Sequence, residues 1–172
     1  MNEKLDFIFS RRSIRQFRDQ RLDGGVIQDL LEAAMAAPSA CAKDPWHFVV
    51  LKAAESRKKL AAGLPYGGML ADAACGVVVC GDLAQAHDGQ LSYLLQDCSA
   101  AIESLLLAAN GLGLGACWLG IHPRSDRIEY VRTLLALPEK IIPVSAVAIG
   151  YPSEQRDKRT RYRAAAVHHE KW

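Results

Sequence analysis

A cluster of arginines near the start of the chain has the residue types that bind a phosphate. The run RRSIR places Arg11, Arg12, Ser13 and Arg15 close together in the sequence, between two expected helices. Guanidinium groups offer forked N–H donors and a permanent positive charge, and a nearby hydroxyl adds a further donor. A solvated basic surface and a nucleic-acid contact are the alternative interpretations. The net charge of only +2 argues against nucleic acid.

A second basic run, KRTRYR, occupies residues 158–163. Residues 1–21 carry six basic and three acidic groups, and residues 156–172 carry six and two, so the two ends together carry +7. That leaves −5 for the middle of a chain whose net charge is +2. One anion shared by both ends would explain this distribution. A free charged tail is the alternative, although its apolar residues Val167 and Trp172 suggest that it docks on a surface.

Two loops have the composition expected around a flat ring. The segment APSACAKDPW, residues 37–46, follows a helix stop at Pro38 and has small side chains that would let a ring approach the backbone. An ordinary turn is the alternative interpretation. The segment GLGLGACWLG, residues 111–120, is not the dinucleotide-binding fingerprint, because its glycines follow a helix and open a strand.

The elements that must position these segments alternate between helices and strands. We expect a short helix over about residues 3–10 and an amphipathic helix that begins after an N-cap at Asp23 and is stopped by Pro38. Short apolar runs predict buried strands, at residues 46–51, 74–80, 114–120 and 144–149. A further helix is expected over about residues 126–136. This pattern predicts a single α+β domain of three layers over residues 1–172.

The helical stretch around residues 97–109 is apolar almost all the way round. A helix that is apolar on every side is buried on every side. One small domain can hardly enclose such a helix, so we expect a second copy of the chain to cover part of it. The sequence therefore predicts a homodimer.

Taken together, these segments resemble the nitroreductase family of flavoproteins. The resemblance covers residues 11–172 and rests on RRSIRQF, APSACAKDPWHFVVL, QDCSAAIESLLLAANGLGLGACWLG, and the ending GYPSEQRDKRTRYR with HHEKW. It implies a three-layer α+β fold with a central, mainly antiparallel or mixed sheet flanked by helices. It also implies a homodimer whose C-terminal segment reaches the partner, with FMN in each of two clefts between the subunits.

The resemblance also assigns cofactor-binding positions. Three N-terminal residues and two C-terminal cations match family residues near the FMN phosphate and ribityl chain: Arg11, Ser13, Arg15, Arg159 and Arg161. Arg12 matches a residue that contacts the flavin through its backbone.

Two further matches concern the isoalloxazine ring of the flavin. Pro38, Ser39 and Ala40 match a loop that packs on this ring from the partner subunit. Leu119 and Gly120 match a strand end whose backbone N–H faces flavin N5, the atom that exchanges hydride.

Two positions depart from the family pattern N-x-Q-P-W. The chain has Ala42 in place of the Asn, which removes an amide from the flavin edge and would change FMN affinity or redox potential. It has Asp44 in place of the Gln, and a carboxylate is unfavourable beside the electron-rich reduced flavin. Cys41 has no visible His partner in the sequence, so we expect no nucleophilic role. Further candidates for pocket lining are Tyr66, Met69 and Trp118.

The implied function is an FMN-dependent oxidoreductase that takes hydride from NADH or NADPH and reduces a small electron-poor acceptor, such as a nitroaromatic or quinone, by a ping-pong mechanism. The cofactor performs the redox step, so no catalytic side chain is expected, and no metal-ligand spacing is present. The alternatives are an FMN-binding protein without this activity, such as a flavin carrier or flavin-consuming enzyme, and a basic interaction module. Five cysteines without pairing signals, no leader and a glycine-interrupted apolar stretch favour the cytoplasm, with no membrane contact.

Overall fold

A four-stranded antiparallel sheet forms the middle of the protein, in the computed structural model that describes residues 2–172. Its strands lie in the order β1-β2-β4-β3. Their bounds are β1 (Trp46–Leu51), β2 (Cys75–Asp82), β3 (Gly115–Gly120) and β4 (Ile141–Gly150). The four expected strands are therefore confirmed, with ends that differ by a few residues at β2, β3 and β4.

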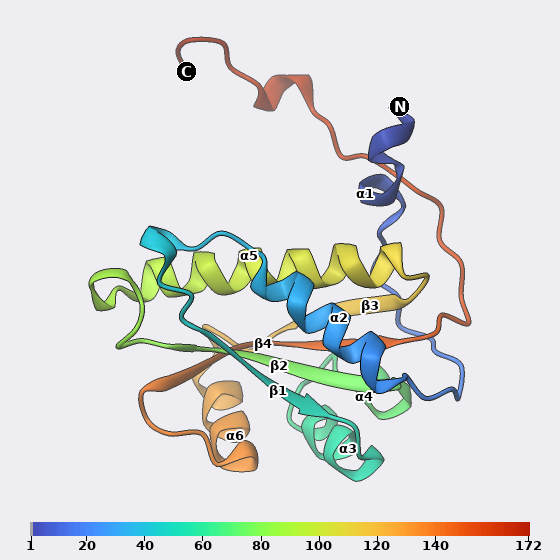
Figure 1. Cartoon of the computed structure of the whole chain (residues 1–172), viewed down its shortest axis with the longest axis vertical. Helices are drawn as coiled ribbons and strands as arrows, with labels where there is room; N and C mark the ends of the chain where they lie inside the picture. The colour runs from blue at the N-terminus through green and yellow to red at the C-terminus, as the bar shows by residue number, and fades with distance from the viewer. Residues whose placement is uncertain (1) are drawn as a thin grey trace.

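Helices cover both faces of this sheet, as Figure 1 shows. One face carries α2 (Gly24–Met35) and α5 (Leu91–Gly111), and α1 (Asp6–Ser10) lies beyond α5. The other face carries α3 (Ala54–Ala62), α4 (Met69–Asp72) and α6 (Ser125–Leu135). Short 3-10 turns occur at Glu3–Leu5, Ala40–Ala42, His87–Gly89 and Ala164–Ala166. The predicted three-layer α+β architecture is confirmed.

The sequence reasoning missed α3 and α4, and the reason is their weak apolar signal. In α3 the residues are AESRKKLAA, and Leu60 alone is buried. In contrast, the start of α2 is predicted correctly from its N-cap residue. In the structure the Asp23 carboxylate accepts a hydrogen bond from the Gly25 N–H at 2.8 Å and caps the helix.

Strand β2 is buried on both sides and separates two apolar cores. Val77 and Val79 belong to the core under α2 and α5, whereas Val78 belongs to the core under α3, α4 and α6. Cys75 and Cys80 fall on opposite faces, as their odd spacing predicts. Burial raises the pKa of Cys75 to about 11 and that of Cys80 to about 12, so both are unreactive core thiols.

The long helix α5 is more fully covered by its own chain than the apolar pattern suggested. Eight of its residues are buried within one chain: Leu94, Asp97, Cys98, Ala101, Ile102, Leu105, Leu106 and Ala109. Ala100, Leu107 and Ala108 remain half-buried, and Glu103 is exposed. The helix therefore has an uncovered strip rather than a second fully apolar face, because the sheet and α2 enclose most of it.

A buried carboxylate secures the end of β2 and predicts an acid-sensitive stability. The Asp82 side chain is 3% exposed; it accepts hydrogen bonds from the Ala84 N–H at 2.9 Å and from the Lys140 ammonium at 2.8 Å. The hydrogen bond from Lys140 lowers the pKa of Asp82 despite burial. This stabilisation is therefore present above the unfolded-state pKa near 3.9 and is lost as the pH falls through the folded-state pKa.

We expect Asp82→Asn to lower the free energy of unfolding by about 1.5–3 kcal/mol at neutral pH, the usual contribution of hydrogen bonds to a charged group. The difference from the unchanged protein should shrink as the pH falls below 4 and protonates Asp82, because both proteins then carry a neutral side chain. Urea unfolding at pH 7 and pH 3 measures it. A pH-independent difference would contradict the assignment.

Within residues 2–172, no helix combines the length and the apolar character needed to cross a membrane.

Candidate cofactor-binding site

The two ends of the chain run side by side along one side of the protein (Figure 1). The Arg18 N–H donates to the Tyr151 carbonyl at 2.8 Å, and the Arg159 N–H donates to the Phe9 carbonyl at 3.3 Å. These backbone bonds join segments that are more than a hundred residues apart in the sequence. The predicted approach of the two basic ends is thus confirmed at the level of the backbone.

Glu154 fixes this pairing at its centre. One carboxylate oxygen accepts the backbone N–H of Arg15 at 2.6 Å and that of Gln16 at 3.2 Å, and the other pairs with Arg156 at 2.6 Å. The backbone hydrogen bond from Arg15 lowers the pKa of Glu154, with a further contribution from Arg156. Glu154 is a positioning residue that sequence reasoning missed, since nothing in the local pattern links it to residues 15 and 16.

Three arginines from the two ends gather around the start of the C-terminal segment. The Arg12 guanidinium donates a hydrogen bond to the Asp157 carbonyl. Repulsion from Arg161, and then from Arg12, lowers the pKa of Arg159, so each of these two cations lies within electrostatic reach of Arg159. Across residues 2–172, no carboxylate forms an ion pair with any of the three. Such a group of uncompensated cations attracts a multiply charged anion.

The other two arginines of the RRSIR run, Arg11 and Arg15, lie near α5 and β3. The Arg11 guanidinium is 3.5 Å from the Glu103 carboxylate of α5. Ser13 forms a single parallel bridge to Ala116 of β3. Burial raises the pKa of Cys117 on the same strand, and the positive charges of Arg15 and Arg11 partly oppose that shift. Ser13 is thus fixed at the edge of the sheet, with Arg11 and Arg15 on either side of it.

A cavity of about 240 Å³ opens beside this edge. Its lining includes Arg15, Tyr66, Trp118, Leu119, Gly120 and Arg127. Of the three side chains that we expected to line a pocket, Tyr66 and Trp118 do so, and the Trp118 indole N–H donates to the Ser145 hydroxyl at 2.5 Å. The expectation for Met69 is wrong: it packs against the core beneath the sheet, because α4 turns it inward.

The outer edge of β3 turns the backbone N–H of Gly120 toward the side of this cavity. In a strand, the N–H and C=O of one residue point to the same side, and successive residues alternate. The Ala116 carbonyl accepts from the Ile14 N–H at 3.0 Å, and the Gly120 carbonyl accepts from the Arg127 guanidinium at 2.9 Å, so both point away from β4. The N–H of Gly120 therefore faces outward as well, whereas that of Leu119 faces β4.

The loop containing Pro38, Ser39 and Ala40 lies away from the arginines of the same chain, near the other end of α5 (Figure 1). The Ala40 N–H donates to the Asp97 carboxylate at 2.9 Å, whereas Arg11 contacts Glu103, about 9 Å further along the helix and about 120° around it. One chain therefore does not bring all eleven expected positions to one place.

The structure shows how Ala42 and Asp44, the two residues that depart from the family pattern, are placed in their loop. The Asp44 carboxylate accepts a hydrogen bond from the Ser39 hydroxyl at 2.5 Å, so it turns back into its own loop. Cys41, Ala42 and Asp44 all have positive φ angles, between 47° and 51°. Such angles are costly for these residue types, so the loop is held by its contacts, including the bond from Ala40 to Asp97. The other oxygen of Asp97 is buried without a hydrogen-bond partner.

Sequence reasoning also missed a contact of Cys41. Its thiol lies 3.8 Å from the Nε2 atom of His87, which comes from a turn before α5. Among the residues described, no group of three or more His, Cys, Asp or Glu side chains could hold a metal ion.

Comparison with known proteins decides the family. The model of the nitroreductase family matches residues 8–64 and 60–151, which together cover most of the chain. The chain belongs to the nitroreductase family. A relative from Archaeoglobus fulgidus with the provisional name NADH dehydrogenase/NAD(P)H nitroreductase is 41% identical, with all of both chains covered.

Solved structures agree with this family assignment. A crystal structure of a provisionally named NADH dehydrogenase/NAD(P)H nitroreductase from Parabacteroides distasonis covers all of both chains, with a TM-score of 0.93 and 37% identity. A nitroreductase from Desulfovibrio desulfuricans was solved in complex with FMN; it covers 100% of this chain and 99% of its own, with a TM-score of 0.85 and 31% identity.

The residues of this nitroreductase family member fit FMN. The unpaired cations match a phosphate dianion, and the outward N–H of Gly120 offers a donor to a ring edge. The 240 Å³ cavity is smaller than the 300–1,000 Å³ typical of a ligand site.

Proposed function

We propose that this protein is an FMN-dependent oxidoreductase that takes hydride from NADH or NADPH and passes electrons to a small electron-poor acceptor, such as a nitroaromatic or quinone. The observation that carries the proposal is the group formed by Arg12, Arg159 and Arg161, which pairs with no carboxylate of residues 2–172 and lies in a chain of the nitroreductase family. FMN, when bound, supplies the hydride-accepting and electron-donating chemistry. The chain's own residues bind it, orient it and limit its exposure to water.

The arginines of both ends would hold the phosphate. Arg12, Arg159 and Arg161 supply charge that no carboxylate of residues 2–172 pairs with. Arg15, which lines the cavity at β3, and Ser13, fixed on that strand, would contact the adjoining ribityl chain. Arg11 would contribute charge from its position beside Glu103.

The open edge of β3 would hold the ring. The Gly120 N–H faces outward at the cavity, where it would donate to a ring nitrogen, and the Arg127 guanidinium donates a hydrogen bond to the Gly120 carbonyl on the same side of the strand. No side chain need act as acid or base in this arrangement. The nicotinamide and the acceptor would use the same open face in turn, which gives ping-pong kinetics.

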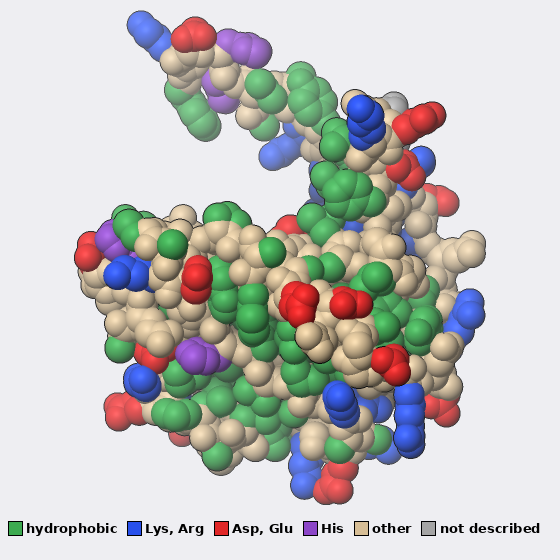
Figure 2. All heavy atoms as spheres, in the orientation of Figure 1, with side chains coloured by type: hydrophobic (Ala, Val, Ile, Leu, Met, Phe, Trp, Pro, Cys, Tyr) green, Lys and Arg blue, Asp and Glu red, His purple; other side chains and the backbone are tan. Residues whose placement is uncertain are grey.

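The site would be completed by a second copy of the chain. The C-terminal segment leaves the body and carries Tyr162, Val167 and Trp172, which are 72%, 45% and 102% exposed. Figure 2 shows apolar side chains along this projecting segment and a hollow between it and the body. Apolar surface of this kind is usually covered by a partner. In a homodimer the partner's Pro38–Ala40 loop would reach the ring.

The cysteines are all free thiols, which supports a reducing compartment such as the cytoplasm.

The test is an anaerobic titration of the purified, FMN-loaded protein with NADH and with NADPH. We expect the flavin absorbance to bleach with at least one of them and to return on addition of a quinone or nitroaromatic. A bound flavin that stays oxidised would favour the alternative of an FMN-binding protein without reductase activity. A colourless protein that also fails to bind added FMN would refute the proposal.

The Ser39–Asp44 hydrogen bond predicts a shift in flavin potential. Ser39→Ala frees the Asp44 carboxylate from its hydrogen bond, which should lower the midpoint potential by up to about 20 mV, because a less shielded negative charge near the ring disfavours reduction and 1 kcal/mol corresponds to about 20 mV for a two-electron couple. Equilibration with a reference dye during slow reduction measures the potential. The double variant Ser39→Ala/Asp44→Asn is the control and should lose the shift; an equal shift in both variants would contradict the role of the carboxylate.

A further inference from the structure

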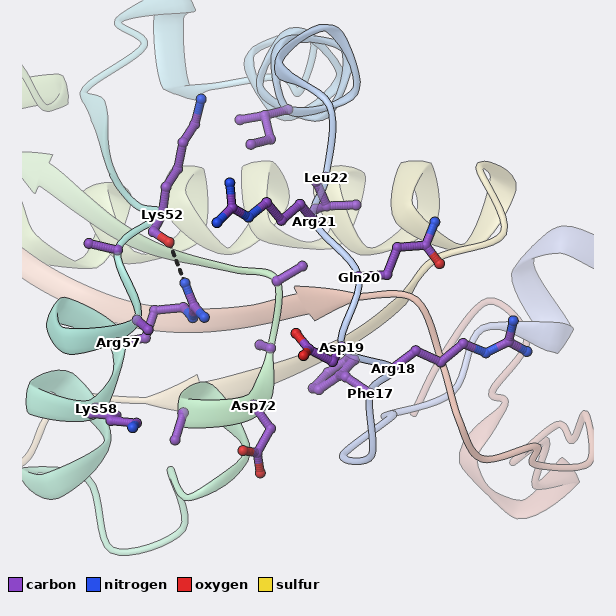
Figure 3. Close-up of a pocket in the computed structure, with 16 residues that line it drawn as sticks. Phe17, Arg18, Asp19, Gln20, Arg21, Leu22, Lys52, Arg57, Lys58 and Asp72 are labelled. Carbon is purple, nitrogen blue, oxygen red and sulfur yellow. Dashed lines mark hydrogen bonds between the residues drawn. The ribbon is translucent and has the colours of Figure 1, made fainter.

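A second and larger cavity lies apart from the candidate flavin site. It measures about 870 Å³ and shares no lining residue with the cavity beside β3. Its walls come from residues 17–22, from the start of α3 and from residues 71–74, which connect α4 to β2 (Figure 3). This volume lies within the 300–1,000 Å³ range of small-molecule sites. We call it the α3 groove.

The groove exists because small side chains line two of its walls. Ala53 and Ala54 stand at the start of α3, and Ala71, Ala73 and Ala74 stand opposite, before β2. None of these side chains extends beyond Cβ, so they leave the space between the walls empty. Phe17, Leu22 and Ile27 add apolar surface on the third wall. These alanine and larger apolar side chains form the floor of the groove, which is therefore suited to a flat apolar group.

The rim of the groove is strongly positive. It carries five cations, Arg18, Arg21, Lys52, Arg57 and Lys58, against the two carboxylates Asp19 and Asp72. None of the five forms an ion pair with a carboxylate of residues 2–172. Figure 3 shows Arg21, Lys52 and Arg57 on one side of the groove, whereas Arg18 points away from them. Arg21, Lys52 and Arg57 thus lie in one region of the groove, and no carboxylate of residues 2–172 forms an ion pair with any of them.

The backbone and Arg57 strengthen this positive field. Arg57 donates a hydrogen bond to the Lys52 carbonyl, which holds its guanidinium at the groove, and its Nε atom is buried without a partner. Ala53 caps α3 with no side-chain hydrogen bond, so the first N–H groups of this nine-residue helix lack a capping partner beside the cations. A phosphate placed here would meet guanidinium, ammonium and amide donors together.

We propose that the α3 groove binds a nucleotide. Arg21, Lys52 and Arg57 hold the phosphates, and Phe17 and the alanine walls receive the base. Asp19, which lies beside Phe17 in Figure 3, accepts hydrogen bonds from the sugar hydroxyls. A nucleotide is favoured over inorganic phosphate because the groove combines cations, a carboxylate and an apolar floor, and phosphate would use only the first. The inference does not depend on the proposed flavin chemistry.

The test is calorimetric titration of the full-length, FMN-saturated protein with ADP, AMP and pyrophosphate. Saturation with FMN prevents the probes from binding at the phosphate position of the flavin. If the protein binds no FMN, it is titrated in the same way. Failure of the flavin proposal therefore does not decide the outcome for the α3 groove. We expect one ADP per chain, bound more tightly than pyrophosphate. Arg21→Gln and Lys52→Gln should each weaken ADP binding roughly tenfold, the loss of one charge-assisted contact.

Two variants make the test specific. Lys59→Gln, on α3 but paired with Glu55 at 2.8 Å and outside the groove, removes the same charge and should leave ADP binding unchanged. Asp19→Asn should weaken ADP binding and not pyrophosphate binding. No ADP binding at concentrations on the order of millimolar, or equal losses in the Lys59 and Lys52 variants, would overturn the site. Pyrophosphate binding as tight as ADP binding would overturn the nucleotide assignment.

Discussion

Replacing Arg161 or Arg11 by alanine is expected to weaken FMN binding by about 30- to 1,000-fold, because each change leaves a phosphate charge without one of its partners in a shielded site. Arg161 lies close enough to Arg159 to lower its pKa, and Arg12 contributes to the same effect. Arg11 lies on the other side of Ser13, against Glu103 of α5. Two variants from opposite ends of the sequence should therefore weaken one binding equilibrium. Fluorescence titration of the apoprotein with FMN measures both.

Arg163→Ala is the matched control for this prediction. It removes the same charge from the same exposed segment, two residues beyond Arg161, and is expected to leave FMN affinity within a factor of about two, since long-range effects of one exposed charge are largely screened at physiological salt. If Arg11→Ala and Arg161→Ala bind FMN like the unchanged protein, the phosphate does not lie between the two ends.

A chain that ends at Arg163 is expected to lose most of its dimer affinity. The shortened chain keeps all the cations of the proposed phosphate site and removes only the last nine residues, with Val167 and Trp172. Burying one large apolar side chain contributes about 1.5–3 kcal/mol, and each dimer would lose two such segments. The dimer dissociation constant should rise by at least about a thousandfold. Sedimentation equilibrium over a range of concentrations measures it.

The full-length variant Lys171→Gln serves as the control for the truncation, because it changes charge in the segment and leaves its apolar residues in place. It should remain dimeric. Flavin retention provides a second measurement: the truncated chain should lose FMN on dilution together with the dimer, because the partner's loop no longer covers the ring. A truncated chain that remains a tight dimer would show that the segment does not dock on the partner.

The two cavities differ in how the chain builds them. The cavity beside β3 is small and lies at an open sheet edge, and under the proposed function a second copy of the chain would complete it. The α3 groove has three walls from a single chain and a volume of about 870 Å³. A ligand of the groove is therefore expected to bind the truncated monomer as well as the dimer, which offers a further distinction between the two sites.

The order of charged, small and apolar segments was sufficient to determine the layers, the strands and the presence of two basic ends. These features depend on local periodicity and composition, which act over a few residues. Helices α3 and α4 were not predicted from the sequence because few of their residues are buried. Among the nine residues of α3, Leu60 alone is buried. The expected position of Met69 was wrong for the same reason, since the direction of a short helix is set by the core that it meets.

Only the tertiary structure decided which of the expected residues meet. It brought Arg12 and Arg161 within electrostatic reach of Arg159, and it separated the Pro38–Ala40 loop from Arg11 by part of the length and circumference of α5. It also turned Asp44 onto Ser39, opened the N–H of Gly120 and not that of Leu119 toward the cavity, and created the α3 groove. The physical reason is that side-chain direction and long-range pairing depend on the packing of the whole sheet, to which each segment contributes only its own surface.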